Sequence, residues 1–349
     1  MVKKAENILV GISIGDLNGI GCEVVLKTFE DARMLELCTP VIFANVKILS
    51  FLRKSFESTA VLHGIDKLEQ IVPGKINVFN LWKESFNLEY GVADEIVGNY
   101  AIKSFVAATQ ALKEGIVDVL VTAPINKYNI QSEEFKFPGH TDYLNQELEG
   151  DALMLMVNDN LRVGLLTDHV PVSEISKHLT EKLIRQKIKT IKHTLVQDFK
   201  ISKPKIAVLG LNPHCGDQGV IGKEDDEVIR PTLKKMFDEG TFVFGPYAAD
   251  SFFGQKAHEN FDAVIACYHD QGLIPFKTLS FGHGVNYTAG LDKIRTSPDH
   301  GTAFEIAGKN QADNNSFKEA VYLAIDIYKA RIEYAQITEN PLKTKEKQF

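Results

Sequence analysis

Three histidines stand directly after apolar stretches of the sequence, and this repeated placement is typical of a metal site. The stretches and their histidines are residues 162–168 with His169, 205–213 with His214, and 261–268 with His269. Three protein ligands with an open fourth position form a catalytic metal centre rather than a structural one. Each histidine could instead make an ordinary hydrogen bond at a strand end. Because the chain has only 10 histidines, three in equivalent places favour one shared metal.

Polar side chains are concentrated between Cys267 and Lys277, immediately after the apolar run 261–266. In open α/β sheets, ligands bind in the crevice beyond the carboxyl ends of the strands. Lys277 is followed by Asn286 and Arg295, and arginine binds phosphate through two parallel hydrogen bonds. These three residues are therefore candidate anion contacts, although each taken alone could equally be a surface residue.

The elements that must position these residues alternate between buried strands and amphipathic helices, which indicates an α/β protein. Expected strands are residues 7–14, 41–44, 117–122, 162–168, 205–211 and 261–266. Expected helices are residues 22–31, 46–56, part of 91–115, 174–196, part of 224–239, and 316–334. The strand at 117–122 is again followed by polar residues, up to Lys127.

Two short segments allow two interpretations each. The glycine-rich residues 15–21 lie between a strand and a helix, where free N–H groups can cradle an anion. Val24 stands where a dinucleotide-binding fingerprint needs its third glycine, so a tight turn is the alternative. His140 precedes Thr141, a suitable helix cap, and would there favour a bound anion. It could also be a capping or surface histidine.

Composition excludes several classes of protein. The chain has 349 residues, 44% of them hydrophobic, which is enough for a large core. Its formal net charge of -7 argues against nucleic-acid binding. Its 4 cysteines show no metal-type or disulfide spacing. No segment approaches the roughly 20 apolar residues of a membrane span, and no signal segment precedes the first strand. We therefore expect a cytoplasmic protein without membrane or nucleic-acid partners.

Five motifs together resemble the 4-hydroxythreonine-4-phosphate dehydrogenase family of vitamin B6 synthesis. They are residues 121–127, 139–141, 211–214, 269–273 and 295–303. The resemblance implies a fold like isocitrate and isopropylmalate dehydrogenases, with two α/β/α domains around a central cleft. Residues 1–130 plus 285–349 would form the first domain, and 131–284 the second, which carries the metal site.

The resemblance also implies a set of site residues and partners. One divalent metal (zinc, magnesium or cobalt) would bind to His169, His214 and His269. The phosphorylated hydroxy amino acid would bind to His140, Thr141, Lys277, Asn286 and Arg295, with His140 a possible catalytic group. NAD or NADP would contact the loop residues His300, Gly301, Thr302, Ala303 and Gly308. The active form would be a homodimer with shared sites.

The implied reaction is NAD-dependent oxidation of 4-phosphooxy-L-threonine with loss of CO2, giving 3-amino-2-oxopropyl phosphate. The chain departs from the commoner family pattern at Leu17-Asn18, at Cys22 and at residues 215–217. A sister dehydrogenase is therefore an alternative. It would act on erythronate or threonate 4-phosphate, or on a carboxylated cyclohexadiene diol. More distant alternatives are a zinc hydrolase, because three histidines and a water suit hydrolysis, and a binding protein without turnover.

Overall fold

The computed structural model describes residues 7–84, 87–132 and 135–340, and its strands form one mixed twelve-stranded sheet. Across the sheet the order is β3 (Leu62–Ile65), β4 (Ile76–Asn80), β2 (Cys38–Ala44), β1 (Ile8–Ser13), β5 (Val119–Thr122), β12 (Arg295–Pro298), β11 (Val285–Leu291), β6 (Gly150–Val157), β7 (Arg162–Leu165), β10 (Ala263–Ala266), β8 (Ile206–Leu209) and β9 (Val243–Tyr247). The predicted α/β class is confirmed.

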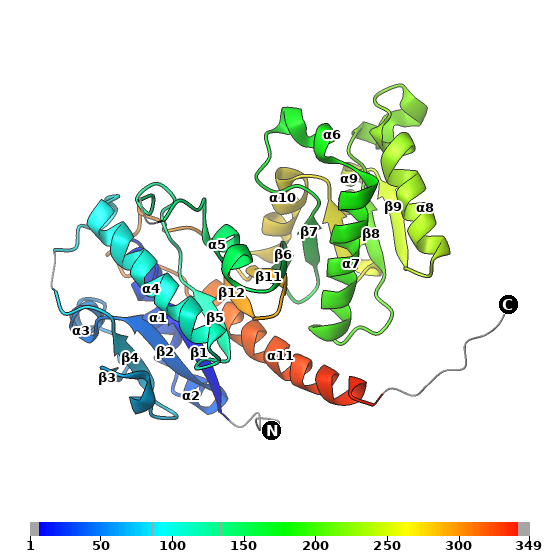
Figure 1. Cartoon of the computed structure of the whole chain (residues 1–349). Coiled ribbons are helices and arrows are strands. Elements are labelled where there is room, and N and C mark those ends of the chain that lie inside the picture. Colours follow the sequence, from blue (N-terminus) through cyan, green and yellow to red (C-terminus); the bar gives the residue numbers. More distant parts are fainter. Residues whose placement is uncertain (1–6, 85–86, 133–134, 341–349) are drawn as a thin grey trace.

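Helices connect most of the strands and cover the sheet (Figure 1). They are α1 (Gly21–Thr28), α2 (Met34–Leu37), α3 (Val46–Ser55), α4 (Glu95–Lys113), α5 (His140–Glu147), α6 (Ile175–His178), α7 (Glu181–Gln197), α8 (Arg230–Asp238), α9 (Ala249–Gly254), α10 (His269–Ser280) and α11 (Asn315–Thr338). Side-chain caps fix several helix starts. Asp94 accepts a hydrogen bond from the N–H of Val97 at α4, and Thr180 accepts one from Leu183 at α7.

The centre of the sheet is antiparallel, whereas the strands on either side of it are parallel. β6 pairs antiparallel with both β11 and β7, and β11 pairs antiparallel with β12. β1 and β5 are parallel, as are β7, β10 and β8. The sheet therefore consists of two parallel parts joined by an antiparallel connection.

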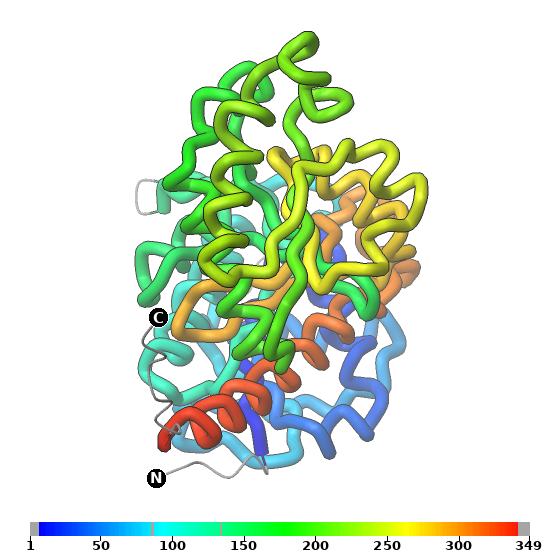
Figure 2. The backbone as a smooth tube through the Cα atoms, turned by 90° about the vertical axis from the view of Figure 1, so that its right-hand side faces the viewer, coloured from blue at the N-terminus to red at the C-terminus, as the bar shows by residue number. Residues whose placement is uncertain are grey.

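Helix α11 crosses the junction between the two parts of the molecule (Figure 2). It packs on β5, β11 and β12, and it contacts α1 in one part and α7 in the other. The division into domains at residues 130 and 285 stays a prediction, and its ranges include residues 1–6 and 341–349, which lie outside the described residues. No helix in the described part of the chain has the length and apolar character needed to cross a bilayer.

The glycine-rich loop between β1 and α1 is a tight turn in which several N–H groups are bonded within the protein. Asp16 N–H donates to the carbonyl of Pro124, Gly19 N–H to that of Asp16, and Ile20 N–H to that of Thr302. Gly15 has a φ of 71°, which an L side chain rarely adopts. Of the two interpretations of this loop, these hydrogen bonds favour the tight turn.

Candidate active site

A cavity of about 280 Å³ lies where α5, β11 and β12 face α10 and the loop after β7. In Figure 1, α5 and α10 stand near the central strands β12, β11 and β6. The cavity brings together nine of the residues predicted from the sequence. They are His140, Thr141, His169, His269, Lys277, Asn286, Arg295, His300 and Gly301. Residues separated by more than 150 positions in the chain thus share one wall.

Arg295 is a buried cation without a carboxylate partner in the part of the chain that the structure describes. Its side chain is 2% exposed, and its Nε and Nη2 donate to Thr122 Oγ1 at 3.0 and 2.6 Å. Nη1 donates to Thr288 Oγ1 at 3.1 Å. Burial lowers the pKa of Arg295 to about 9. Because burying an uncompensated charge is costly, this guanidinium is suited to binding an anion from the cavity.

His140 is the fourth contact of that guanidinium. Arg295 Nη2 lies 3.0 Å from His140 Nδ1, and a guanidinium only donates hydrogen bonds, so Nδ1 accepts and the proton of the neutral ring sits on Nε2. Burial, followed by the charges of Arg295 and Lys127, lowers the pKa of His140 well below its ordinary value. Nε2 is buried and has no hydrogen-bond partner among the described residues. His140 is therefore a neutral ring held in one tautomer.

The other candidate substrate contacts approach from three elements. Thr141 lies in the first turn of α5, and Lys277 lies near the end of α10. Asn286 on β11 stands opposite Ser297 on β12, and its Oδ1 is buried without a partner in the described part of the chain. These side chains provide hydrogen-bonding groups around the cavity.

The three candidate metal ligands follow three adjacent parallel strands, as the sequence indicated. β7, β10 and β8 precede His169, His269 and His214 respectively. The rings of His169 and His269 lie 6.1 Å apart between centroids. His269 Nδ1 is 2.7 Å from the Asp270 carboxylate, an arrangement that leaves Nε2 free to bind a metal.

His214 does not join them within this chain. It is absent from the cavity wall, and it lies in a strained turn in which it has a φ of 53° and Cys215 a φ of 54°. The N–H groups of Leu211 and Asn212, just before this turn, donate to the buried Asp225 carboxylate. Across residues 7–84, 87–132 and 135–340, no group of three His, Cys, Asp or Glu side chains could hold a metal ion. One chain therefore offers two of the three predicted ligands at the cavity.

The candidate cofactor loop begins at the cavity and leads away from it. His300 and Gly301 line the cavity, whereas Thr302, Ala303 and Gly308 do not. His300 Nε2 is a further buried group that lacks a partner among the residues described. A Cβ on Gly308 would lie 2.4 Å from the ring of Tyr90, so this position requires glycine. The loop thus packs closely on the first part of the molecule.

Sequence reasoning did not assign some residues of this cavity. Thr122, Lys127, Asp142 and Asp299 also line it. Thr122 ends β5, so the rule that ligands bind beyond the carboxyl ends of strands could have identified it. Its contact with Arg295, 173 positions away in the sequence, is visible only in the folded chain.

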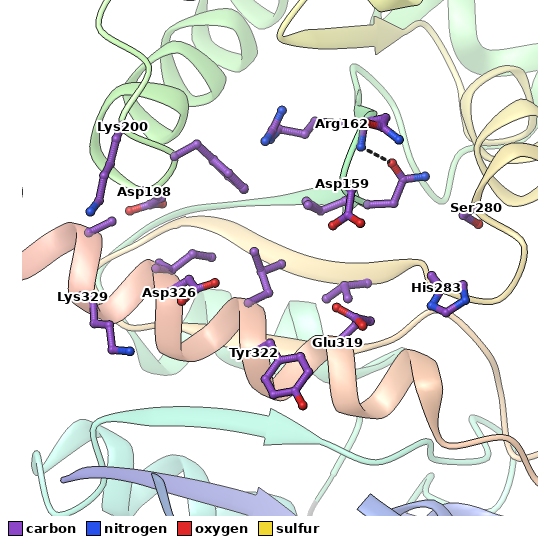
Figure 3. Close-up of a pocket in the computed structure, with 18 of the residues that line it drawn as sticks. Asp159, Arg162, Asp198, Lys200, Ser280, His283, Glu319, Tyr322, Asp326 and Lys329 are labelled. Atoms are coloured by element: carbon purple, nitrogen blue, oxygen red, sulfur yellow. Dashed lines mark hydrogen bonds between the residues drawn. The ribbon is translucent and has the colours of Figure 1, made fainter. Parts of the chain in front are cut away.

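A second cavity, of about 590 Å³, lies between α11, the end of α7, the β6–β7 turn and the end of α10 (Figure 3). The Asp159 and Glu319 carboxylates point into it from opposite sides, and burial raises the pKa of Glu319. Arg162 lies over the Phe199 ring at 4.5 Å. This cavity mixes both signs of charge and contains none of the predicted site residues.

Known proteins resemble this chain over nearly its whole length. The family model described as pyridoxal phosphate biosynthetic protein PdxA matches residues 36–324. The chain is 45% identical over 340 residues to the 4-hydroxythreonine-4-phosphate dehydrogenase of Bacteroides thetaiotaomicron, covering 97% of this chain and 93% of the relative. It is 34% identical to a putative D-threonate 4-phosphate dehydrogenase of Oceanobacillus iheyensis, covering 91% and 97%.

Solved structures show the same similarity. The crystal structure of 4-hydroxythreonine-4-phosphate dehydrogenase from Klebsiella pneumoniae superposes with a TM-score of 0.78 at 32% sequence identity, covering 93% of this chain and 98% of that one. The similarity therefore includes both parts of the sheet.

Proposed function

The chain belongs to the pyridoxal phosphate biosynthetic protein PdxA family, and we propose from this membership and the cavity that it is a 4-hydroxythreonine-4-phosphate dehydrogenase. The reaction oxidises the C3 hydroxyl of 4-phosphooxy-L-threonine: hydride leaves C3 for the cofactor, and the hydroxyl proton leaves the oxygen. The resulting β-keto acid loses its C1 carboxyl as CO2, and C2 is protonated to give 3-amino-2-oxopropyl phosphate.

The observation that carries this proposal is the buried guanidinium of Arg295, whose partners among the described residues are all neutral, in a cavity shared with Lys277 and Lys127. A substrate with both a phosphate and a carboxylate supplies the missing negative charge. Two carboxylates, Asp142 and Asp299, also line the cavity and suit the ammonium group of an amino acid. This feature favours the amino acid over a sugar-acid phosphate.

His140 takes part as a neutral hydrogen-bonding group in this proposal. With Nδ1 accepting from Arg295, its remaining nitrogen carries a proton and cannot remove one from the substrate. His140 and Arg295 therefore bind and orient the substrate together with Thr141 and Asn286.

The metal site in this proposal is completed by a second subunit. His169 and His269 line the cavity, whereas His214 of the same chain does not, so a homodimer in which the partner supplies its own copy of this histidine accounts for the three-ligand set. A divalent metal held there would supply Lewis-acid chemistry at the substrate's hydroxyl oxygen. Zinc, magnesium and cobalt are the candidates.

Mixed subunits test this arrangement. A His214→Ala chain keeps its own cavity residues, and a His269→Ala chain can supply the missing His214. Mixed dimers of these two inactive variants are expected to regain one working site out of two. As a control, mixing His140→Ala with His269→Ala chains is expected to restore nothing, because both residues line the same cavity of one chain. Equal behaviour of the two mixtures would contradict a site shared in this way.

The cofactor is NAD or NADP, bound along the loop from His300 to Gly308, and it accepts the hydride when bound. Support comes from the place of His300 and Gly301 on the cavity wall and from the unpartnered Nε2 of His300. A cytoplasmic location stays a prediction. A zinc hydrolase is not favoured, because the relatives are named dehydrogenases.

A substrate panel tests the function directly. Purified protein with NAD or NADP and a divalent metal is offered 4-phosphooxy-L-threonine, D-threonate 4-phosphate, D-erythronate 4-phosphate and a carboxylated cyclohexadiene diol, and reduced cofactor is followed by absorbance. We expect the highest kcat/KM with 4-phosphooxy-L-threonine. A higher value with a sugar-acid phosphate would replace the proposal with the threonate-type activity of the Oceanobacillus relative.

A further inference from the structure

Lys127 is a lysine of the cavity whose charge has no counter-ion among the residues that the structure describes. It follows β5 by five positions and lines the same cavity as Arg295 and His140. No hydrogen bond or ion pair involves its ammonium group within the described residues. Lysines at protein surfaces are commonly solvated and without function, so its surroundings must decide whether this one has a role.

The backbone that carries Lys127 is fixed rather than free. Asn126 Oδ1 accepts from the N–H of Tyr128 at 2.9 Å, directly after Lys127. Two positions further, Asn129 Nδ2 donates to the buried carboxylate of Asp16 at 2.8 Å. The segment is thus held by a local hydrogen bond and is also anchored to the first loop of the chain. Lys127 therefore has a defined place at the cavity.

That place is beside the first turn of α5. The Cε atom of Lys127 lies 3.7 Å from where a Cβ on Gly139 would stand, and it is the only neighbour within 4 Å of that point. Gly139 precedes α5 and provides no side-chain cap. The first N–H groups of a helix have no partner inside it, and among the described residues the N–H groups of residues 140–142 find no acceptor outside the helix either.

Two further groups face the same end of the cavity. Arg295 is buried with four neutral contacts, and the buried Nε2 of His140 lacks a partner among the described residues. The charge of Lys127 is felt by His140, since it contributes to the lowered pKa of that ring. Lys277 and the two cavity histidines line the cavity from α10 and from the loop after β7.

We infer that Lys127, with Arg295 and the first turn of α5, forms the binding site for the substrate's phosphate group. This inference rests on the proposed function. A phosphate dianion needs more than one positive charge and several donors; one ammonium, one guanidinium, the Thr141 hydroxyl and the free N–H groups supply them. The reacting carbon and the carboxylate then extend towards Lys277, His169 and His269 on the other side of the cleft.

Steady-state kinetics and phosphate binding test this role with matched variants. Lys127→Met removes the charge but keeps the length of the side chain, and Lys127→Arg keeps the charge. Lys136→Met is the control, because Lys136 is an exposed lysine of the same connecting segment that does not line the cavity. Circular dichroism and thermal unfolding of each variant confirm that it folds as the wild type does.

Lys127→Met is expected to raise KM for 4-phosphooxy-L-threonine roughly tenfold to a hundredfold, the effect of losing one charge-assisted contact. Its kcat should change little, because the charge and bonding of the phosphate stay the same throughout the reaction, so its contacts act equally in the ground state and the transition state. Inorganic phosphate should inhibit the wild type competitively and the variant more weakly by a similar factor. With 4-hydroxythreonine, which has no phosphate, wild type and variant should behave alike. Lys127→Arg should recover most of the loss.

Two outcomes overturn the inference. One is a Lys127→Met enzyme that behaves like Lys136→Met, and the other is an equal loss on phosphorylated and unphosphorylated substrates. If the wild type does not oxidise 4-phosphooxy-L-threonine at all, the proposed function fails, but calorimetric titration with inorganic phosphate still decides about Lys127. Phosphate binding that is lost in Lys127→Met and kept in Lys136→Met supports the proposed phosphate-binding site. Equal phosphate binding in both variants contradicts it.

Discussion

Arg295 and His140 lie side by side at the base of the cavity, with Nη2 of the arginine 3.0 Å from Nδ1 of the histidine. The two residues come from β12 and from the start of α5, so this contact connects two elements 155 positions apart. This contact gives the guanidinium a neutral acceptor, and it holds the imidazole as the Nε2–H tautomer.

Arg295→Lys is expected to lower kcat/KM for the phosphorylated substrate by about tenfold to a hundredfold, although the charge is kept. Lysine cannot reach Thr122, Thr288 and His140 simultaneously, and it cannot offer an anion two parallel donors. A stopped assay across substrate concentrations measures the loss. If Arg295→Lys matched the wild type, the contacts made by the planar guanidinium would be irrelevant to substrate binding.

The lowered pKa of His140 predicts a dependence of stability on pH. The folded protein keeps the ring neutral below the ordinary pKa of 6.5, whereas the unfolded chain takes up a proton there. More protons are then bound in the unfolded state, so this residue's contribution to stability is fully present above about pH 6.5 and is lost as the pH falls below it. The slope is at most about 1.4 kcal/mol per pH unit.

Urea unfolding of wild type and His140→Gln at pH 7.5 and 5.5 measures this contribution. The change in the free energy of unfolding between the two pH values is compared between the two proteins, so the contributions of the other titrating groups cancel. We expect the wild type to lose more stability than the variant between the two pH values. Equal losses would show that His140 takes up no fewer protons in the folded state than in the unfolded chain.

Local sequence patterns were sufficient for part of this site. The apolar runs before His169, His214 and His269 are buried strands, and β7, β10 and β8 are indeed adjacent and parallel. The antiparallel centre was not predicted, because β6 and β11 pair across more than 120 positions and neither strand has a hairpin turn that would indicate its partner.

Side-chain direction was also beyond the sequence. His214 follows its strand as expected, but the left-handed turn from His214 to Gly219 keeps it off the cavity wall. The left-handed conformation is uncommon for four of these residues, which are not glycine, so no local propensity indicates it. Equally, the contact of Thr122 with Arg295 depends on β5 and β12 being neighbours, which no local pattern indicates.

Asp270→Asn is expected to weaken metal binding about tenfold to a hundredfold while the histidines stay in place. The Asp270 carboxylate lies 2.7 Å from His269 Nδ1, and it fixes the tautomer that leaves Nε2 free. An asparagine can still accept a hydrogen bond but carries no charge. Metal content after dialysis against a graded chelator series gives the affinity without an activity assay. His269→Ala should lose the metal outright, and unchanged affinity in Asp270→Asn would mean that the carboxylate does not act through His269.

Asp198 and Arg331 form a buried ion pair at the edge of the second cavity. Breaking this pair is expected to lower the free energy of unfolding of the protein strongly. Arg331 Nε lies 2.7 Å from Asp198 Oδ1, and the side chains are 14% and 1% exposed. Tyr287 donates its hydroxyl proton to Asp198 at 2.6 Å and receives a hydrogen bond from Arg331. Arg331→Met leaves the carboxylate buried and unpaired, so we expect a loss of roughly 3–5 kcal/mol in the free energy of unfolding.

Partner variants separate the charge from the packing. Asp198→Asn combined with Arg331→Met removes both charges, and we expect this double variant to be more stable than Arg331→Met alone, since no uncompensated ion is left. Tyr287→Phe, which removes only a hydroxyl group, should cost about 1 kcal/mol. Urea unfolding at constant protein concentration measures all four proteins. A double variant less stable than Arg331→Met would show that the asparagine, rather than the lost charge pair, is the damaging change.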